Sequence, residues 1–91
     1  MQPPPVVALN LAVAVAMADG PQARLALVER LGASGALEGY HLFHSTRADL
    51  LRRLDRREEA ATSYRRALEL VTNPAERRFL ERRLNEVSVA L

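Results

Sequence analysis

Two histidines, a serine and an aspartate lie between positions 41 and 49 and carry the side chains that catalysis or metal binding would use. His41 and His44 are three positions apart, a helical spacing that can hold a metal ion. A third ligand is not evident, because the chain contains no cysteine and no HExxH pattern. We therefore expect no metal and no cofactor here. His44 would instead be a core residue, and His41 a surface or interface residue.

Ser45, together with His41 and Asp49, supplies the residue types of a hydrolytic triad. Neighbours at i and i+4 on a helix form hydrogen bonds readily, however, and no oxyanion hole accompanies these three. The four glycines stand in turns and not in a phosphate-binding loop. We expect a chain without catalytic residues that is not an enzyme.

Adjacent arginines dominate the second half of the chain, and all thirteen basic residues are arginine. Acidic residues four positions on predict ion pairs of Arg65 with Glu69, Arg77 with Glu81 and Arg82 with Glu86, on solvated helix faces. The alternative is a basic strip that contacts acidic protein or nucleic-acid phosphate, formed by Arg52, Arg53, Arg56 and Arg57. Aromatic stacking partners are few, and we expect Tyr64 and Phe79 in the core. Direct nucleic-acid contact is therefore not expected.

Proline, glycine and asparagine divide the chain into five predicted helices, over 5–18, 21–31, 40–53, 57–71 and 74–90. No stretch alternates like a strand, so the predicted fold class is all-α. The last helix carries the apolar stripe of Leu80, Leu84, Val87 and Leu91, which is typical of a capping helix.

Small and large residues recur in the fourth and third helices where two helices would pack together. Ala60 is followed by Tyr64 and Ala67 on one face, and Ala48 by Leu51. This spacing is typical of a tetratricopeptide repeat. His44, Arg47 and Asp55 depart from it, since they replace a bulky aromatic, a leucine and the turn glycine between the helices.

A second, poorer copy appears thirty-six residues earlier, where Ala12 falls on Ala48, Val15 on Leu51, Asp19 on Asp55, Val28 on Tyr64 and Leu31 on Ala67. We predict one domain over 1–91, built from antiparallel hairpins over 5–31 and 40–71 and the capping helix over 74–90.

The first helices of the two hairpins would line a concave protein-binding groove. Its apolar end would be Val6, Leu9, Val13 and Met17, and its polar end Leu42, Ser45, Asp49, Arg52 and Arg53. Asn10 is the only polar side chain between Val6 and Ala18, and a helix that is apolar all round expects cover on every side. We expect the rest of a longer polypeptide, or a second copy of this chain in a homodimer, to cover it. The other interpretation packs this helix tightly against the next two.

The apolar run of positions 6–18 does not indicate export or a membrane span. No positive charge precedes it, and its thirteen residues are too few to cross a bilayer. We therefore expect a cytoplasmic protein that has no contact with membrane.

Three stretches resemble the C-terminal part of bacterial extracytoplasmic-function (ECF) RNA polymerase sigma factors that carry a long tetratricopeptide-like extension. They are ALNLAVAVAMADGPQARLALVERL, GYHLFHSTRADLLRRLDRREEAATSYRRALEL and NPAERRFLERRL. The turn Asp19-Gly20-Pro21 and the helix entry Gly39-Tyr40-His41-Leu42 are the most distinctive matches. In that family the promoter-binding regions lie upstream, and the extension is regarded as modulating them.

The resemblance implies a non-catalytic regulatory domain that acts in transcription initiation and is a fragment of a longer chain. Its partners would be the upstream sigma-factor regions, RNA polymerase or a regulatory protein. The alternative is a free-standing tetratricopeptide-like adaptor or homodimerisation module that is unrelated to transcription.

Val13→Asp combined with Met17→Asp tests the predicted apolar end of the groove. If that end binds a partner, the double variant loses association while the helical content of the 40–71 hairpin is retained, because a buried unpaired carboxylate is costly. Circular dichroism and analytical ultracentrifugation measure the two effects. Loss of all folding would show instead that the first helix is core.

Overall fold

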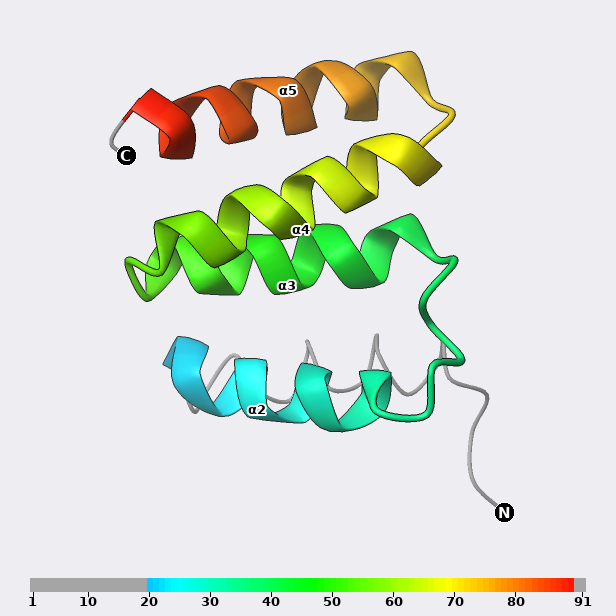
Figure 1. The fold of residues 1–91 in the computed structure, drawn as a ribbon, viewed down its shortest axis with the longest axis vertical. Helices are drawn as coiled ribbons and strands as arrows, with labels where there is room; N and C mark the ends of the chain where they lie inside the picture. The colour runs from blue at the N-terminus through cyan, green and yellow to red at the C-terminus, as the bar shows by residue number, and fades with distance from the viewer. Residues whose placement is uncertain (1–19, 90–91) are drawn as a thin grey trace.

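The computed structural model describes residues 20–89 of the 91-residue chain, and all regular secondary structure in that range is α-helix. The helices are α2 (Gly20–Gly32), α3 (His41–Arg53), α4 (Arg57–Leu70) and α5 (Pro74–Val89) (Figure 1). Their bounds follow the predicted ranges closely, and the all-α prediction is confirmed for this part of the chain. The predicted helix over 5–18 and Leu91 lie outside the described residues.

Each described helix runs antiparallel to the one before it and packs against it, so that α2, α3, α4 and α5 follow one another through the molecule (Figure 1). Short connections of this kind favour antiparallel neighbours, because the chain must reverse direction within a few residues. α3 is therefore packed between α2 and α4, and the part of its surface that neither helix covers lies beside both.

Alanines form the contact between α3 and α4. Ala48, Ala60 and Ala67 are completely buried, and their small side chains let the two helix backbones approach closely. Leu51 and Tyr64 fill the space beside them and are equally inaccessible. Burying one such large side chain stabilises the fold by about 1.5–3 kcal/mol. The packing positions predicted for this hairpin are confirmed.

The turn between α3 and α4 contains Asp55 in the left-handed backbone conformation, with φ of 60°. The amide of Asp55 donates to the Arg52 carbonyl at 3.0 Å, and that of Arg56 to the Leu51 carbonyl at 2.9 Å. This is the hydrogen-bond pattern of a Schellman helix end, which glycine usually occupies because it has no Cβ. Aspartate tolerates the conformation better than most residues, so it can replace the expected turn glycine.

The connection from α2 to α3 contributes its own core residue. Leu37 is only 1% exposed and packs in the same hydrophobic cluster as Leu25 and Val28 of α2. Phe43 and Leu50 belong to that cluster from the side of α3. The non-helical segment over 33–40 is thereby held against the helices.

Asn73 and Pro74 start α5. The Asn73 side-chain oxygen accepts hydrogen bonds from the amides of Ala75 at 2.8 Å and Glu76 at 3.1 Å, as an N-cap residue does. Proline fits the first helical position, where its missing N–H costs no hydrogen bond. α5 then buries Leu80 and Val87 in the core.

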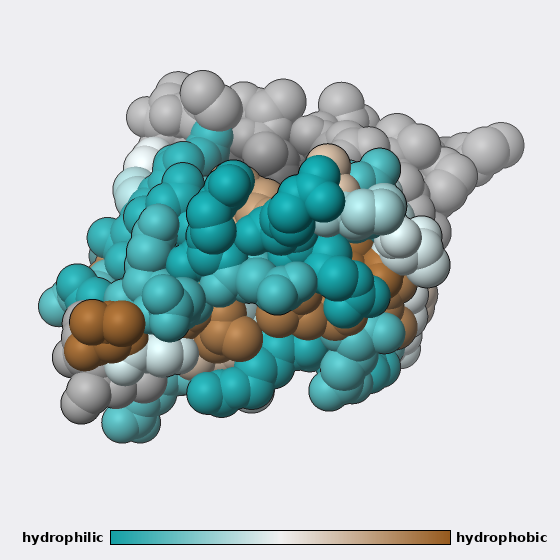
Figure 2. All heavy atoms as spheres, turned by 90° about the horizontal axis from the view of Figure 1, so that it is seen from above, coloured by the Kyte–Doolittle hydropathy of each residue, from teal (hydrophilic) through white to brown (hydrophobic). Residues whose placement is uncertain are grey.

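The opposite side of α5 is polar. Figure 2, which looks down onto this helix, shows a mostly hydrophilic surface interrupted by hydrophobic residues. A polar outer face is what a capping helix needs, and that Pro74–Val89 serves as one stays a prediction. None of the helices in residues 20–89 has the length and apolar character needed to cross a lipid bilayer.

Gly32→Ala should destabilise the protein by about 1–3 kcal/mol, the usual cost of overpacking a core. A Cβ at Gly32 would overlap Cζ of the buried Phe43 ring, so the ring or one of the two helices would have to shift. Urea denaturation followed by circular dichroism measures the change.

Two further variants test whether the contact with Phe43 is the cause. Phe43→Leu in the Gly32→Ala background should cost less than the sum of the two single changes, because the smaller side chain removes the clash. Gly39→Ala is the control, since its Cβ meets nothing within 4 Å. A Gly32→Ala variant as stable as the parent would contradict the close approach.

Candidate functional site

The structure brings together the α3 part of the groove that the sequence predicts. Leu42, Ser45, Asp49 and Arg52 are half-buried, and Arg53 is exposed. All of them except Arg52 line two neighbouring hollows. That they bind protein stays a prediction.

The predicted apolar end of the groove lies outside the described residues. It comprises Val6, Leu9, Val13 and Met17.

The larger of these two neighbouring hollows, called the larger hollow below, has a volume of about 340 Å³ and is lined by side chains from α2, α3, α4 and α5. Most of its walls come from α3, and the remainder from single residues of the other three helices. The lining residues are Arg24, Ser45, Thr46, Asp49, Leu50, Arg53, Tyr64 and Phe79. Four helices must therefore be in place before this surface exists.

Two smaller hollows adjoin the larger one at Phe79. One, of about 180 Å³, lies between the starts of α3 and α5, where His41 Nε2 and a Glu76 carboxylate oxygen are 2.9 Å apart. Leu42, Ser45 and Leu80 complete its lining with Phe79. The other, of about 170 Å³, lies along α5 and is lined by Phe79, Arg82, Arg83 and Glu86. Phe79 is common to all three.

Asp49 is the carboxylate that the charged and polar side chains in and beside the larger hollow contact. Its carboxylate accepts a hydrogen bond from Arg52 at 2.8 Å, lies 3.5 Å from Arg53 and is 3.4 Å from the Tyr64 hydroxyl. The hydrogen bond to Asp49 raises the pKa of the Arg52 guanidinium above its usual value. Burial raises the pKa of the Tyr64 hydroxyl, so the phenol is held neutral.

The residue types of the hydrolytic triad do not assemble. The Ser45 hydroxyl donates to the Leu42 carbonyl of its own helix at 3.1 Å. His41 pairs with Glu76, and Asp49 with two arginines. Each side chain is engaged in helix structure or in an ion pair, and none is placed to activate the hydroxyl.

His44 takes the core position predicted for it. The side chain is buried, and its Nε2 lies 2.7 Å from the Glu38 carbonyl oxygen. The rings of His44 and Phe43 contact each other edge to face, with centroids 5.0 Å apart. No group of three or more potential ligands that could hold a metal ion occurs within residues 20–89.

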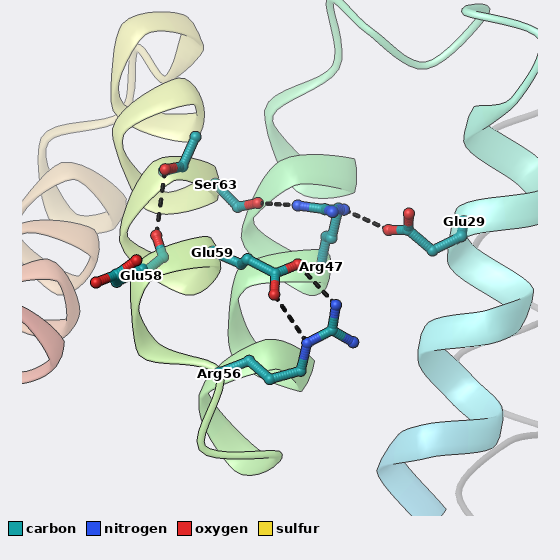
Figure 3. A network of polar contacts seen from close by, with 7 residues as sticks. Glu29, Arg47, Arg56, Glu58, Glu59 and Ser63 are labelled. Atoms are coloured by element: carbon teal, nitrogen blue, oxygen red, sulfur yellow. Dashed lines mark hydrogen bonds and ion pairs between the residues drawn. The ribbon is translucent and has the colours of Figure 1, made fainter.

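Arg47 has a structural role that the sequence analysis missed. It occupies the position where the repeat pattern expects a leucine, and its guanidinium joins Glu29 of α2 to Ser63 of α4, the latter at 2.6 Å (Figure 3). Arg56 and Glu59 form a separate pair nearby, and this hydrogen bond lowers the pKa of the Glu59 carboxyl (Figure 3). The sequence feature that could have indicated this role is Ser63, a polar residue directly before the core residue Tyr64.

The predicted ion pairs at i,i+4 are wrong in their choice of arginine. Glu69 pairs with Arg66 at 2.8 Å, and Glu86 with Arg83 at 3.0 Å, both at i,i+3. Arg77 donates instead to the Val71 carbonyl at 2.9 Å. Sequence spacing allows either member of an arginine pair to reach the glutamate, and packing decides which one does.

The four arginines of the proposed basic strip all have acidic partners. Arg52 and Arg53 contact Asp49, Arg56 contacts Glu59, and Arg57 contacts Asp55 at 2.8 Å. Exposed pairs of this kind contribute little stability, but they halve or cancel the local positive charge.

Phe79 is not in the core, so that prediction is wrong. Its side chain is 43% exposed, and the Arg83 guanidinium carbon lies 5.1 Å from the ring centroid, a cation–π contact. Leu80 and Val87 take the buried face of α5, and Phe79 is one residue before Leu80, about 100° further around the helix. The spacing of Phe79 and Arg83 at i,i+4 was the signal for the pair.

No family model matches this chain, and no solved structure gives a significant match. A protein of Rhizobium meliloti (strain 1021), described as an uncharacterized protein, is 44% identical to it over 88 residues. The match covers 97% of this chain and 20% of the relative. The chain therefore spans about a fifth of the length of that relative.

Tyr64 predicts a loss of stability at alkaline pH. The folded-state pKa is raised above the ordinary value of 10.0, so folding holds the proton more tightly than the unfolded chain does. Stability is unaffected by this group below pH 10.0 and falls as the pH rises from there toward the folded pKa, by up to about 1.4 kcal/mol per pH unit. Urea denaturation at several pH values measures it.

Tyr64→Phe is the matched control, because it keeps the buried ring and removes the titrating hydroxyl. The variant should lack the alkaline loss that Tyr64 causes. If the free energy of unfolding fell equally with pH in the parent protein and in Tyr64→Phe above pH 10.0, the prediction would be contradicted.

Proposed function

We propose that this chain is a tetratricopeptide-like protein-interaction domain that serves as the C-terminal regulatory extension of a bacterial ECF sigma factor in the cytoplasm. The observation that carries the protein-binding part is the open face of α3, where hollows lined by four helices combine apolar and charged side chains. The side chains that could do chemistry are engaged elsewhere, as Ser45 illustrates. Such a surface is suited to binding a polypeptide.

Burial at a spacing of thirty-six residues supports the repeat assignment. Val28 of α2 and Tyr64 of α4 are this far apart, and both are 1% exposed. The same shift relates His44 to Leu80 and Leu51 to Val87, from α3 to α5, and all four are buried. Equivalent positions thus serve as core in successive helical units, as expected for a stacked repeat.

The shift also has exceptions, and for one of them we offer a steric explanation. The shift relates the buried Phe43 to the exposed Phe79, and Gly32 to Leu68. Gly32 leaves room for the Phe43 ring, and a leucine at the corresponding place is a far larger side chain. We infer that Phe79 stays on the surface for this reason, and that the exposed ring belongs to the binding face.

The link to transcription depends on the sequence resemblance described above, above all on the Asp19-Gly20-Pro21 turn and the Gly39-Tyr40-His41-Leu42 helix entry. The Rhizobium relative is consistent with it, because this chain matches only 20% of that protein. The remainder leaves room for regions that would read a promoter. In this proposal the domain holds or positions those regions, or receives RNA polymerase or a regulatory protein.

A free-standing adaptor is the second candidate. The same surface would then bind a partner protein, or a second copy of this chain, with no connection to transcription. The open face of α3 supports both candidates equally.

The reading frame upstream of the codon for Gln2 separates the two candidates. A frame that stays open through a promoter-reading helix-turn-helix is the expected result. A stop codon before any such region would overturn the link to sigma factors and leave the adaptor.

Ser45→Arg in the full-length protein tests the binding face, because Ser45 lines both the larger hollow and the one beside His41. An arginine there fills the groove, and we expect transcription from the target promoter to change at least about fivefold, as regulatory couplings typically do. Run-off transcription with RNA polymerase core measures the change.

Thr62→Arg is the matched control. Its hydroxyl, like that of Ser45, bonds to a carbonyl of its own helix, but Thr62 is exposed on α4 and lines a different hollow, of about 470 Å³, that shares no residue with these two. If both variants behaved as the parent protein does, the open face of α3 would have no part in regulation.

A further inference from the structure

Phe79 lies at the centre of a continuous exposed surface. It lines all three adjoining hollows, and the larger one shares Ser45 with the hollow beside His41. Phe79 and Val89 are the large hydrophobic residues that are most exposed within residues 20–89. We name as the Phe79 surface the exposed ring with the exposed or half-buried arginines that line the two hollows beside it, Arg53, Arg82 and Arg83.

Positive charge exceeds negative charge around this ring. The two arginine-lined hollows contain two carboxylates, those of Asp49 and Glu86. Asp49 is already shared between Arg52 and Arg53, and Glu86 is held by Arg83. Arg52, Arg53, Arg82 and Arg83 thus lie around three carboxylates, those of Asp49 and Glu86 and that of Glu76, which is paired with His41, so positive charge exceeds negative charge by one.

Arg82 is the clearest of these cations. It is exposed, and no ion pair or hydrogen bond of its side chain occurs within residues 20–89. Arg83 next to it stacks on Phe79, which presents an apolar ring bordered by guanidinium groups. Aromatic and arginine side chains side by side are the residue types that dominate protein-binding energy.

We infer that the Phe79 surface binds an acidic segment of a different protein. In this complex an apolar side chain of the segment packs on the Phe79 ring and into the larger hollow, and flanking carboxylates pair with arginines such as Arg53 and Arg82. The inference rests on the proposed protein-binding function and adds the chemistry of the partner. The larger hollow, at about 340 Å³, has the size of a small binding pocket.

A peptide fits this surface better than a nucleic acid does. Nucleic acid would stack a base on Phe79, but its regularly spaced phosphates would also meet the carboxylates of Asp49, Glu76 and Glu86 around the ring. An acidic peptide can place neutral residues opposite those carboxylates and charged residues opposite the arginines.

A second copy of the chain is a poor occupant for electrostatic reasons. The chain has a net charge of +2, and its acidic cluster at Asp55 and Glu59 is already paired with Arg57 and Arg56. Two copies would therefore bring surfaces of like charge together.

Fluorescence anisotropy with synthetic peptides tests the inference on the 91-residue chain. The probe is a fluorescein-labelled peptide in which glutamates flank a single leucine, and the comparison peptide has glutamine in place of every glutamate. The chain should bind the glutamate peptide at least about tenfold more tightly. Raising the ionic strength from about 0.1 M to about 1 M should remove the difference, because it shortens the screening length from about 10 Å to about 3 Å.

Two substitutions place the binding on the Phe79 surface. Phe79→Ala and Arg82→Glu should each weaken binding of the glutamate peptide by about tenfold, the effect of losing one important contact. Arg65→Glu is the matched control, since Arg65 is likewise exposed and unpaired within residues 20–89 but lines none of the three hollows. It should change binding by less than about twofold, and circular dichroism verifies that all three variants are folded.

Three outcomes would overturn the inference. The first is equal binding of the glutamate and glutamine peptides, which leaves a protein-binding face without a preference for acid. The second is absence of binding to the glutamate peptide by the folded chain. The third is displacement of that peptide by single-stranded DNA at lower concentration than by unlabelled peptide. The reading frame and the Ser45→Arg variant judge the proposed regulatory function separately.

Discussion

The close approach of α3 and α4 is the constraint on which the rest of this structure depends. It is possible because Ala48, Ala60 and Ala67 have side chains too small to keep the two backbones apart. Tyr64 can then be fully buried and still reach Asp49 with its hydroxyl, 3.4 Å away. The contact places the α3 and α4 side chains that line the larger hollow, and Arg24 of α2 and Phe79 of α5 complete its lining.

Polar contacts between helices set the geometry around this apolar hairpin. Arg47 connects α2 to α4 through Glu29 and Ser63, and the Arg56–Glu59 pair beside the hairpin turn lies nearby (Figure 3). Ion pairs at half-exposed sites contribute little net stability, because desolvation offsets much of the attraction. Their value here is directional, since the guanidinium can satisfy both partners only when the three helices are correctly placed.

Phe43 and Phe79, thirty-six residues apart, differ in exposure, since the first ring is buried and the second is 43% exposed. Gly32 accommodates Phe43, and the corresponding residue before Phe79 is Leu68. We infer that this difference of one side chain in the preceding helix separates the buried phenylalanine from the exposed one. The Phe79 ring lies in contact with the Arg83 guanidinium instead of in the core.

Local physical chemistry, which the sequence determines by itself, accounts for the helices and the hairpin packing. The bounds of α3 and α4, the cap at Asn73 and the burial of Tyr64 follow from periodicity, proline positions and side-chain size. Asp55 takes the turn position where the repeat pattern has glycine, and its φ of 60° is the left-handed conformation that glycine usually adopts there.

Only the tertiary structure decided which neighbour each exposed side chain meets. Periodicity states that residues share a helix face, but it does not state what lies opposite that face. The arginine partners of Glu69 and Glu86, the bridge made by Arg47 and the exposure of Phe79 all depend on a second helix. Long, flexible side chains reach several partners at similar cost, so their pairing is settled by packing and not by sequence spacing.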